Sequence, residues 1–265
     1  MLPAIEDSEA GPLDLAAEGV WPPARLVRLG GWRCRLDRGV TRRANSVLAL
    51  EAPASELGSA IDQVEKLYRE LGLRPCFQIT PACRPGDLPA VLVARGYRTE
   101  GSSWVMGAVG DRVASEAKSA TTLGTPGDDL PVALAPRADD AWMDCYQAGI
   151  DPATRQVRRS ILSRIEEPAA FAQVGAEDEI QAVGVAACAR GTVWINCMQT
   201  APTFRRRGAA RRILGALARW ALDQKPAPHH NRLYLQVEAD NGPARALYEG
   251  LGFQTLYAYH YMVRP

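Results

Sequence analysis

Apolar residues recur at helix and strand spacing along most of the chain. Residues 56–71 place large apolar side chains on one helix face, and Gly72 follows where a helix commonly ends. A second helical face comes after residue 210 and comprises Ile213, Leu214, Leu217, Trp220 and Ala221. Strand patterns occupy residues 32–36, 46–50, 75–80, 192–200 and 233–238. The pattern predicts a protein that mixes helices and strands.

The order of the predicted elements occurs twice. Helix 56–71, strand 75–80 and helix 87–94 are followed by Gly96-Tyr97 and a strand at 104–106. A helix after residue 210, strand 233–238 and a helix from Asn241 are likewise followed by Gly252-Phe253 and a strand at 259–263. The repetition predicts an internal repeat of two related units.

The amino-acid composition of the segments outside the two repeated sets of elements predicts the domain boundaries. We assign the first unit to residues 21–110 and the second to residues 132–265. Residues 111–131 are rich in Ala, Ser, Thr, Gly and Asp, which favours a linker. Residues 1–20 are acidic and are expected to be loosely ordered. In the second unit, helices at 139–148 and 152–166 are expected before a hairpin of strands 170–174 and 180–189.

Composition and charge narrow the classes of function. The 265 residues are 47% hydrophobic and 23% charged, as in ordinary globular proteins. A net charge of +1 argues against a general nucleic-acid binder. The six cysteines show no metal-ligand spacing and are expected to be reduced thiols in a cytoplasmic protein without a metal. The N-terminal residues lack the basic start and apolar run of a signal peptide or membrane anchor.

The stretch 202–210 carries the clearest candidate chemistry. It reads Pro-Thr-Phe-Arg-Arg-Arg-Gly-Ala-Ala and lies between a predicted strand and a predicted helix. Gly208 and the small residues after it expose backbone N–H groups at the positive end of the helix dipole, which suits a phosphate. Arg205, Arg206 and Arg207 add positive charge. The single glycine excludes a dinucleotide fingerprint, and the absence of Lys-Ser or Lys-Thr excludes a Walker loop.

Two motifs resemble the GNAT superfamily of N-acetyltransferases. The spacing Arg205-x-x-Gly208-x-Ala210, after Pro202 and Phe204, resembles the acyl-coenzyme A loop of that superfamily. Residues 233–238 have the pattern Leu-x-Leu-x-Val-Glu, where x is any residue. Residues 241–253 have the pattern Asn-x-x-Ala-x-x-Leu-Tyr-x-x-x-Gly-Phe. These resemble the second half of a GNAT domain. The likeness extends from about residue 132 to the C-terminus.

The resemblance implies a fold of the α+β (α/β) class. We expect a mixed, largely antiparallel central sheet flanked by helices, in a tandem arrangement of two GNAT-like units. The first unit looks degenerate, because residues 51–58 stand where the arginine loop should recur and are acidic. An acidic helix start repels a pyrophosphate, so the first unit is not expected to bind coenzyme A.

The resemblance also implies contacts with acetyl-CoA as cosubstrate. The backbone of Met198 and Thr200 is expected to pair with the pantetheine arm, although Thr200 departs from the usual aliphatic residue. The pyrophosphate is expected within the loop formed by Arg205, Arg206, Arg207, Gly208, Ala209 and Ala210. Asn241 is expected near the pantetheine amide, and it also has the pattern of a helix N-cap.

Two residues are candidates for catalysis. By resemblance, Tyr248 donates a proton to the departing thiolate, whereas the alternative is a core tyrosine on an amphipathic helix. Glu238 closes the strand before the Asn241 helix and is a candidate general base, with the ordering of the following loop as the equal alternative. Cys197 is better explained by core packing, because transfer of the GNAT type needs no nucleophile.

Three functions remain open from the sequence. The favoured one is an acetyl-CoA-dependent N-acetyltransferase that acts on the primary amine of a small or amino-acid-like molecule. The alternatives are a protein acetyltransferase, for lysine or N-terminal amines, and a module that binds acyl-CoA without turnover. No nucleic-acid or membrane partner is expected. The sequence leaves open the acceptor and the choice between a monomer and a homodimer.

Overall fold

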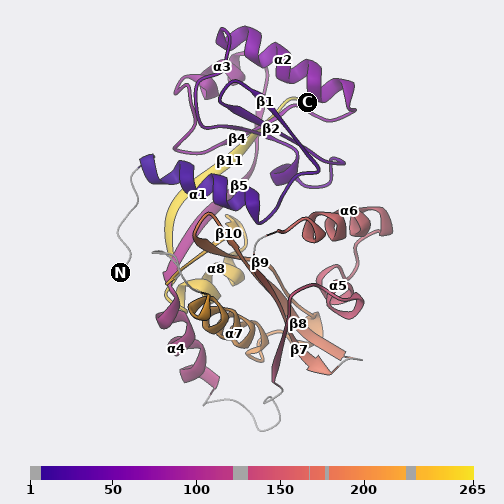
Figure 1. The fold of residues 1–265 in the computed structure, drawn as a ribbon, viewed down its shortest axis with the longest axis vertical. Helices are drawn as coiled ribbons and strands as arrows, with labels where there is room; N and C mark the ends of the chain where they lie inside the picture. Colours follow the sequence, from indigo (N-terminus) through magenta and orange to yellow (C-terminus); the bar gives the residue numbers. More distant parts are fainter. Residues whose placement is uncertain (1–6, 122–130, 167, 177–178, 225–230) are drawn as a thin grey trace. The chain divides into compact units, whose positions relative to one another are not determined.

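A computed structural model describes residues 7–121, 131–166, 168–176, 179–224 and 231–265. Contacts within the chain divide it into two compact units. The first unit comprises the described residues of 4–104 together with 256–265, and the second comprises those of 105–255. Both units contain strands and helices, as Figure 1 shows.

The sheet of the first unit has the order β1-β2-β3-β4-β11. Its strands are β1 (Arg25–Leu29), β2 (Trp32–Leu36), β3 (Val47–Ala49), β4 (Cys76–Ile79) and β11 (Gln254–Val263). Its helices are α1 (Asp7–Gly19), η1 (Arg42–Ala44), α2 (Leu57–Glu70) and α3 (Leu88–Ala94). Trp32, Ile61 and Phe77 belong to one buried apolar cluster, which joins β2, α2 and β4. The predicted helix at 56–71 therefore covers the sheet with its apolar face.

The expected disorder of residues 1–20 is wrong for the part that the structure describes. Helix α1 spans Asp7–Gly19 and buries Ala10, Leu13 and Ala16. The buried carboxylate of Asp14 accepts a hydrogen bond from the Tyr257 hydroxyl at 2.8 Å. Most of the buried apolar side chains of α1 are alanines, so its apolar face gives a weak pattern in the sequence.

The sheet of the second unit has the order β5-β10-β9-β8-β7-β6. Its strands are β5 (Arg98–Val109), β6 (Val132–Ala135), β7 (Ala169–Ala176), β8 (Glu179–Ala189), β9 (Thr192–Thr200) and β10 (Arg232–Glu238). Strands β6 to β9 are antiparallel neighbours, and β10 runs parallel to β9. The helices are α4 (Gly110–Thr121), α5 (Asp140–Tyr146), α6 (Pro152–Ser163), η2 (Pro202–Phe204), α7 (Ala209–Asp223) and α8 (Gly242–Glu249). The predicted mixed, largely antiparallel sheet flanked by helices is confirmed.

The segment that we assigned to a linker begins with a packed helix. Residues 110–121 form α4, and Val113 and Ala117 are buried. Helix α4 packs along α7, as Figure 1 shows within the second unit. A Cβ atom at Gly215 of α7 would lie 2.7 Å from the Cβ atom of Ala117, so this glycine permits the close approach of the two helices.

The two strands that parallel each other in the repeated order have different partners. In the first unit, β11 pairs antiparallel with β4, with Met262 opposite Phe77 and Val263 opposite Cys76. In the second unit, β5 is the neighbour of β10. Of the strand after Gly96-Tyr97, residues 105–109 belong to the second unit, whereas residues 256–263 of the last strand belong to the first. The repeated order of elements does not specify strand partners, which depend on contacts distant in sequence.

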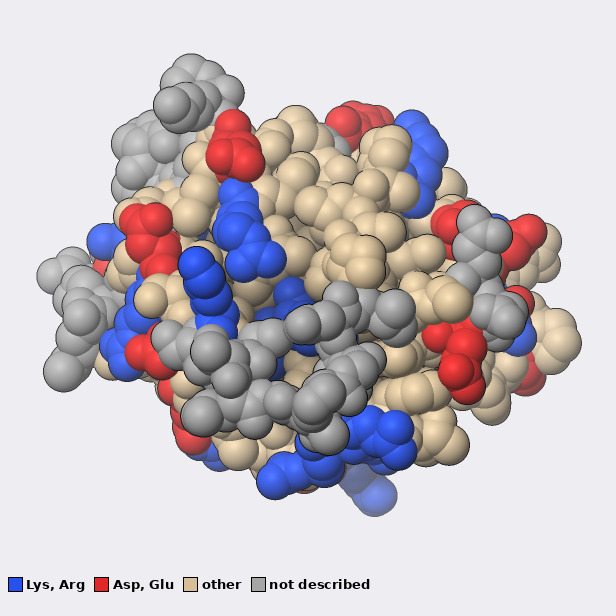
Figure 2. Space-filling view, turned by 90° about the horizontal axis from the view of Figure 1, so that it is seen from below, with Lys and Arg blue, Asp and Glu red and all other residues tan. Residues whose placement is uncertain are grey.

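The described surface carries charges of both signs. Figure 2 shows Lys and Arg side chains in several groups on one face, with Asp and Glu side chains between and beside them. This distribution agrees with the net charge of +1. Among the described helices, none is long and apolar enough to cross a membrane.

Candidate active site

The loop between β9 and α7 has the geometry of an anion site. Strand β9 leads through η2 and residues 205–208 into α7. Gly208 has a φ of +84°, in the left-handed region that favours glycine, and its carbonyl accepts the N–H of Arg212 at 3.0 Å. The first N–H groups of α7 have no acceptor within the helix, and they lie at the positive end of a 15-residue helix. Such a helix start binds phosphate groups readily.

The three arginines that were expected to bind the pyrophosphate come just before this helix start and are exposed to solvent. Arg205, Arg206 and Arg207 are exposed together with Gly208, whereas the next residue, Ala209, is buried and anchors the helix. The Arg207 guanidinium lies over the Phe204 ring, 5.6 Å from its centroid. This contact places one positive charge beside the aromatic residue of the motif.

Strand β9 carries a bulge just before the loop. Val185 of β8 pairs with Asn196, but Val183 pairs with Gln199, so two residues of β9 oppose one residue of β8. Cys197, at the bulge, has a φ of +55°. A bulge bends its strand and redirects the residues that follow it. Met198 and Thr200 therefore lie on the bent end of β9, immediately before the loop.

Strands β9 and β10 pair over only part of their lengths. Their parallel register runs from Val193 opposite Leu233 to Ile195 opposite Leu235. Strand β9 continues to Thr200 and β10 continues to Glu238 beyond that register. Two parallel strands that part in this way leave an edge on which an extended chain can pair with the backbone.

Gly184 supports this region of the site and was not predicted from the sequence. A Cβ atom at this position of β8 would lie 2.5 Å from Met198 Sδ and 2.8 Å from Ile213 Cγ2. The absence of a side chain therefore allows the bulge of β9 and the first turns of α7 to pack together. A glycine inside a strand pattern is the available sequence signal for a bulge or a close backbone approach.

Tyr248 lies on α8 with its ring in an apolar setting. The residue is buried, and its ring meets the edge of Phe253 with 5.8 Å between centroids. Burial raises the pKa of Tyr248 to about 12, so the phenol keeps its proton at neutral pH. A Cβ atom at Gly250, just after α8, would lie 3.6 Å from Nη2 of Arg211. The guanidinium of Arg211, from the first turn of α7, thus reaches the end of α8.

Glu238 ends β10, and Asn241 lies immediately before the first residue of α8. The Asn241 side chain accepts the Ala244 N–H at 3.1 Å, so the predicted N-cap is present. The Glu238 carbonyl accepts the Asn241 N–H at 3.0 Å, while the Glu238 residue is exposed at the end of β10. The Glu238 carboxylate is therefore accessible to solvent, and its backbone supports the turn.

The described cysteines and acidic residues give no sign of other chemistry. No disulfide joins the six cysteines. Burial raises the pKa of Cys34 to about 12 and that of Cys145 to about 11, so both remain thiols at neutral pH. Within the described ranges, no cluster of three or more His, Cys, Asp or Glu side chains could hold a metal ion.

Solved GNAT structures resemble the whole chain. A GCN5-related N-acetyltransferase from Kribbella flavida has a TM-score of 0.67 and 16% identity, over 97% of this chain and 95% of that one. A tandem GNAT protein from the clavulanic acid biosynthesis pathway has a TM-score of 0.62 and 16% identity, over 99% of this chain and 96% of that one. At this level of identity, the likeness shows the fold.

Sequence comparison supplies the family. The uncharacterized N-acetyltransferase YobR of Bacillus subtilis (strain 168) is 24% identical over 255 residues, which are 95% of this chain and 97% of YobR. Fold and sequence together define the protein as a GNAT acetyltransferase. The chain belongs to the family described as "Probable histone acetyltransferase Rv0428c C-terminal", whose model matches residues 8–262. The predicted membership of the GNAT superfamily is confirmed.

Proposed function

We propose that the protein transfers an acetyl group from acetyl-CoA to the primary amine of a small or amino-acid-like molecule. The observation that carries this proposal is the β9–α7 loop, in which three exposed arginines precede Gly208, whose left-handed backbone leads into the start of α7. A pyrophosphate is doubly charged and needs N–H donors and fixed cations within one short segment. This loop supplies both.

The residues around the loop fit the remaining parts of coenzyme A. Arg205, Arg207, Gly208 and Ala210 would hold the pyrophosphate, with Arg206 and Ala209 in the same loop. The backbone of Met198 and Thr200, where β9 has parted from β10, would pair with the pantetheine arm. Asn241 would lie near the pantetheine amide while its side chain caps α8.

The proposed chemistry requires one proton acceptor and one proton donor. Acetyl-CoA supplies the acetyl group as a thioester; the new C–N bond forms as the C–S bond breaks. Glu238 would accept the proton that the amine loses, directly or through water, because an ammonium cannot attack. Tyr248 would donate a proton to the departing sulfur, and its raised pKa keeps that proton available at neutral pH.

A protein amine is the second candidate acceptor. The description of the matching family, a probable histone acetyltransferase, favours this alternative. The third candidate is a module that binds acyl-CoA without turnover. In such a module, the β9–α7 loop would bind the coenzyme as well as it would in an enzyme. The three candidates differ in which acceptor, if any, releases coenzyme A.

A thiol-release screen separates these candidates. The full chain would be incubated with acetyl-CoA and pooled small amines, amino acids, aminoglycosides or lysine-containing peptides, and the release of coenzyme A thiol would be followed. We expect release with a pool of small amines. Release with peptides alone would establish the protein acceptor instead, and binding of acetyl-CoA without release from any pool would favour the non-catalytic module.

A further inference from the structure

A cavity of about 290 Å³ lies between α5 and α6 of the second unit. Its lining consists of Met143, Gln147, Pro152, Arg155, Gln156 and Arg159. This volume is near the lower end of the range for small-molecule sites, about 300–1,000 Å³, and suits a molecule the size of an amino acid. Helix α5 packs against β8 and β9, so the cavity belongs to the same unit as the arginine loop.

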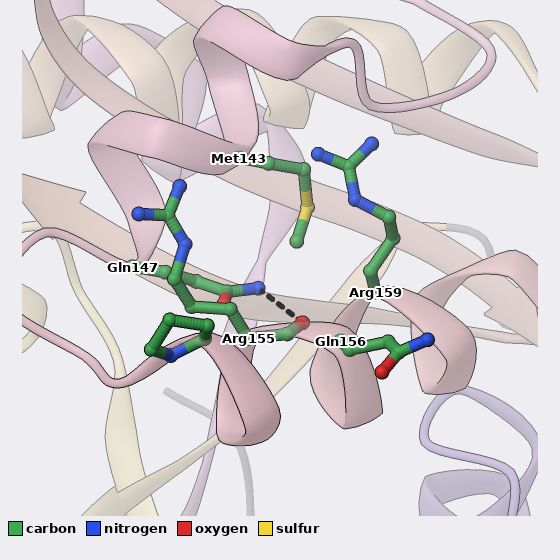
Figure 3. Close-up of a pocket in the computed structure, with 6 residues that line it drawn as sticks. Met143, Gln147, Arg155, Gln156 and Arg159 are labelled. Carbon is green, nitrogen blue, oxygen red and sulfur yellow. Dashed lines mark hydrogen bonds between the residues drawn. The ribbon is translucent and has the colours of Figure 1, made fainter.

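Gln147 contributes a buried acceptor that the described protein leaves unsatisfied. The residue is fully buried, and its Nε2 donates to the Arg155 carbonyl at 3.3 Å, as the dashed line in Figure 3 marks. Among the described residues, none donates a hydrogen bond to its Oε1 atom. Buried amide oxygens almost always have a donor. A ligand N–H or O–H is the kind of partner that this oxygen lacks.

Two arginine side chains line the same cavity. Arg155 and Arg159 are four residues apart on α6 and share one helix face. Figure 3 shows their side chains on either side of Met143. Arg155 pairs with Asp144, and Arg159 pairs with Asp140 at 2.8 Å. Both aspartates are exposed, so these pairs are weak and leave several of the five N–H donors of each guanidinium for another anion.

We infer that this cavity binds an organic anion, a carboxylate or a phosphate ester. Arg155 and Arg159 hold the anionic group, Met143 and Pro152 contact the carbon skeleton, and Gln147 Oε1 accepts a hydrogen bond from the ligand. Resting on the proposed function, the inference adds that the anion is part of the amine acceptor. A lysine-rich protein segment would bring further positive charge to the two arginines and is therefore disfavoured at this site.

Matched pairs of amines test this inference by calorimetry. The full chain would first be saturated with coenzyme A, which occupies the arginine loop. It would then be titrated with β-alanine or ethylamine, and with O-phosphoethanolamine or ethanolamine. In at least one pair, we expect the amine that carries the carboxylate or phosphate to bind about tenfold or more tightly than the amine that lacks it. The reason is that charged hydrogen bonds to arginine are strong. The pair that shows the preference identifies the carboxylate or the phosphate.

Variants assign the preference to the cavity. Arg155→Gln with Arg159→Gln should remove it while the affinity for coenzyme A is unchanged. Arg219→Gln, at an exposed arginine three turns into α7, is the matched control and should retain the preference. Equal binding of both members of each pair, no binding up to about 10 mM, retention of the preference in the double variant, or tighter binding of a lysine-rich peptide would overturn the inference.

The titrations and the thiol-release screen together separate this inference from the proposed function. If the chain fails to bind coenzyme A but shows the anion preference without it, the cavity is an anion site and the proposed function fails. If coenzyme A binds and only amines without an anionic group cause release of the coenzyme A thiol from acetyl-CoA, the proposed transfer holds and the anion site is overturned.

Discussion

Tyr248 is the residue on which the proposed proton donation depends. Its phenol is buried beside Phe253, and burial raises its pKa to about 12. Tyr248→Phe keeps the ring contact and removes the donor. We expect kcat for thiol release to fall about 10²- to 10⁴-fold, with little change in the affinity for acetyl-CoA. The raised pKa also predicts that Tyr248 causes no loss of activity as the pH rises to about 9.

The matched control for that variant is Tyr257→Phe, which removes a hydroxyl from a buried tyrosine of the first unit. It should leave kcat unchanged. An unchanged kcat in Tyr248→Phe would instead support the alternative in which Tyr248 is a core residue. The motif around Tyr248 made this residue predictable from the sequence, whereas its burial and pKa depend on the packing of α8 against Phe253.

Asp14 makes the stability of the protein depend on pH. Burial raises its pKa from 3.8 to about 6, although the hydrogen bonds from its neighbours oppose the rise. Because the folded pKa exceeds the unfolded value, the stabilising contribution of Asp14 is complete below pH 3.8 and is lost as the pH rises through about 6. The change corresponds to about 3 kcal/mol.

Asp14→Asn isolates this contribution. We expect the free energy of unfolding of the variant, relative to that of the wild type, to increase between about pH 4 and pH 7, as measured by urea denaturation. Parallel pH curves for the two proteins would contradict the assignment. The role of Asp14 could not be predicted from the sequence, because its partner Tyr257 lies near the other end of the chain.

Helices α1 and α4 show why some elements were missed. Both pack through small side chains, such as Ala16 in α1 and Ala117 in α4, and these produce a weaker apolar pattern than the large residues of α2 and α7. The Gly-Ser-Thr composition near α4 also favoured a linker. The partners of β5 and β11 could not be predicted from the repeated order of elements, since strand pairing is set by contacts far apart in sequence.

The packing of α4 on α7 is testable through Gly215. In Gly215→Ala the new methyl group would meet Ala117, only 2.7 Å away, so we expect a loss of about 1–3 kcal/mol in the free energy of unfolding. Ala117→Gly in the same chain should restore part of that loss, because it removes the opposing methyl group. A stabilising effect of Gly215→Ala alone, as expected for an exposed helix, would show that α4 does not pack there.

At the scale of the whole molecule, the two units are related in element order but differ in chemistry. The second unit has the arginine loop, the bulged β9 and Tyr248, whereas the corresponding loop of the first unit contains Glu51 and Glu56. The loop motif was readable because its residues are contiguous. The α5–α6 cavity was not readable, because its lining depends on how two helices pack and carries no contiguous signature.

Calorimetric titration of acetyl-CoA into the full chain tests the central claim most directly. We predict one site per chain, and an affinity about tenfold or more weaker in Arg205→Ala with Arg207→Ala, because charged hydrogen bonds to phosphate would be lost. Arg219→Ala serves as the control with unchanged affinity. A stoichiometry of two would contradict the degenerate first unit, and an unchanged affinity in the double variant would contradict the assignment of the β9–α7 loop to the coenzyme.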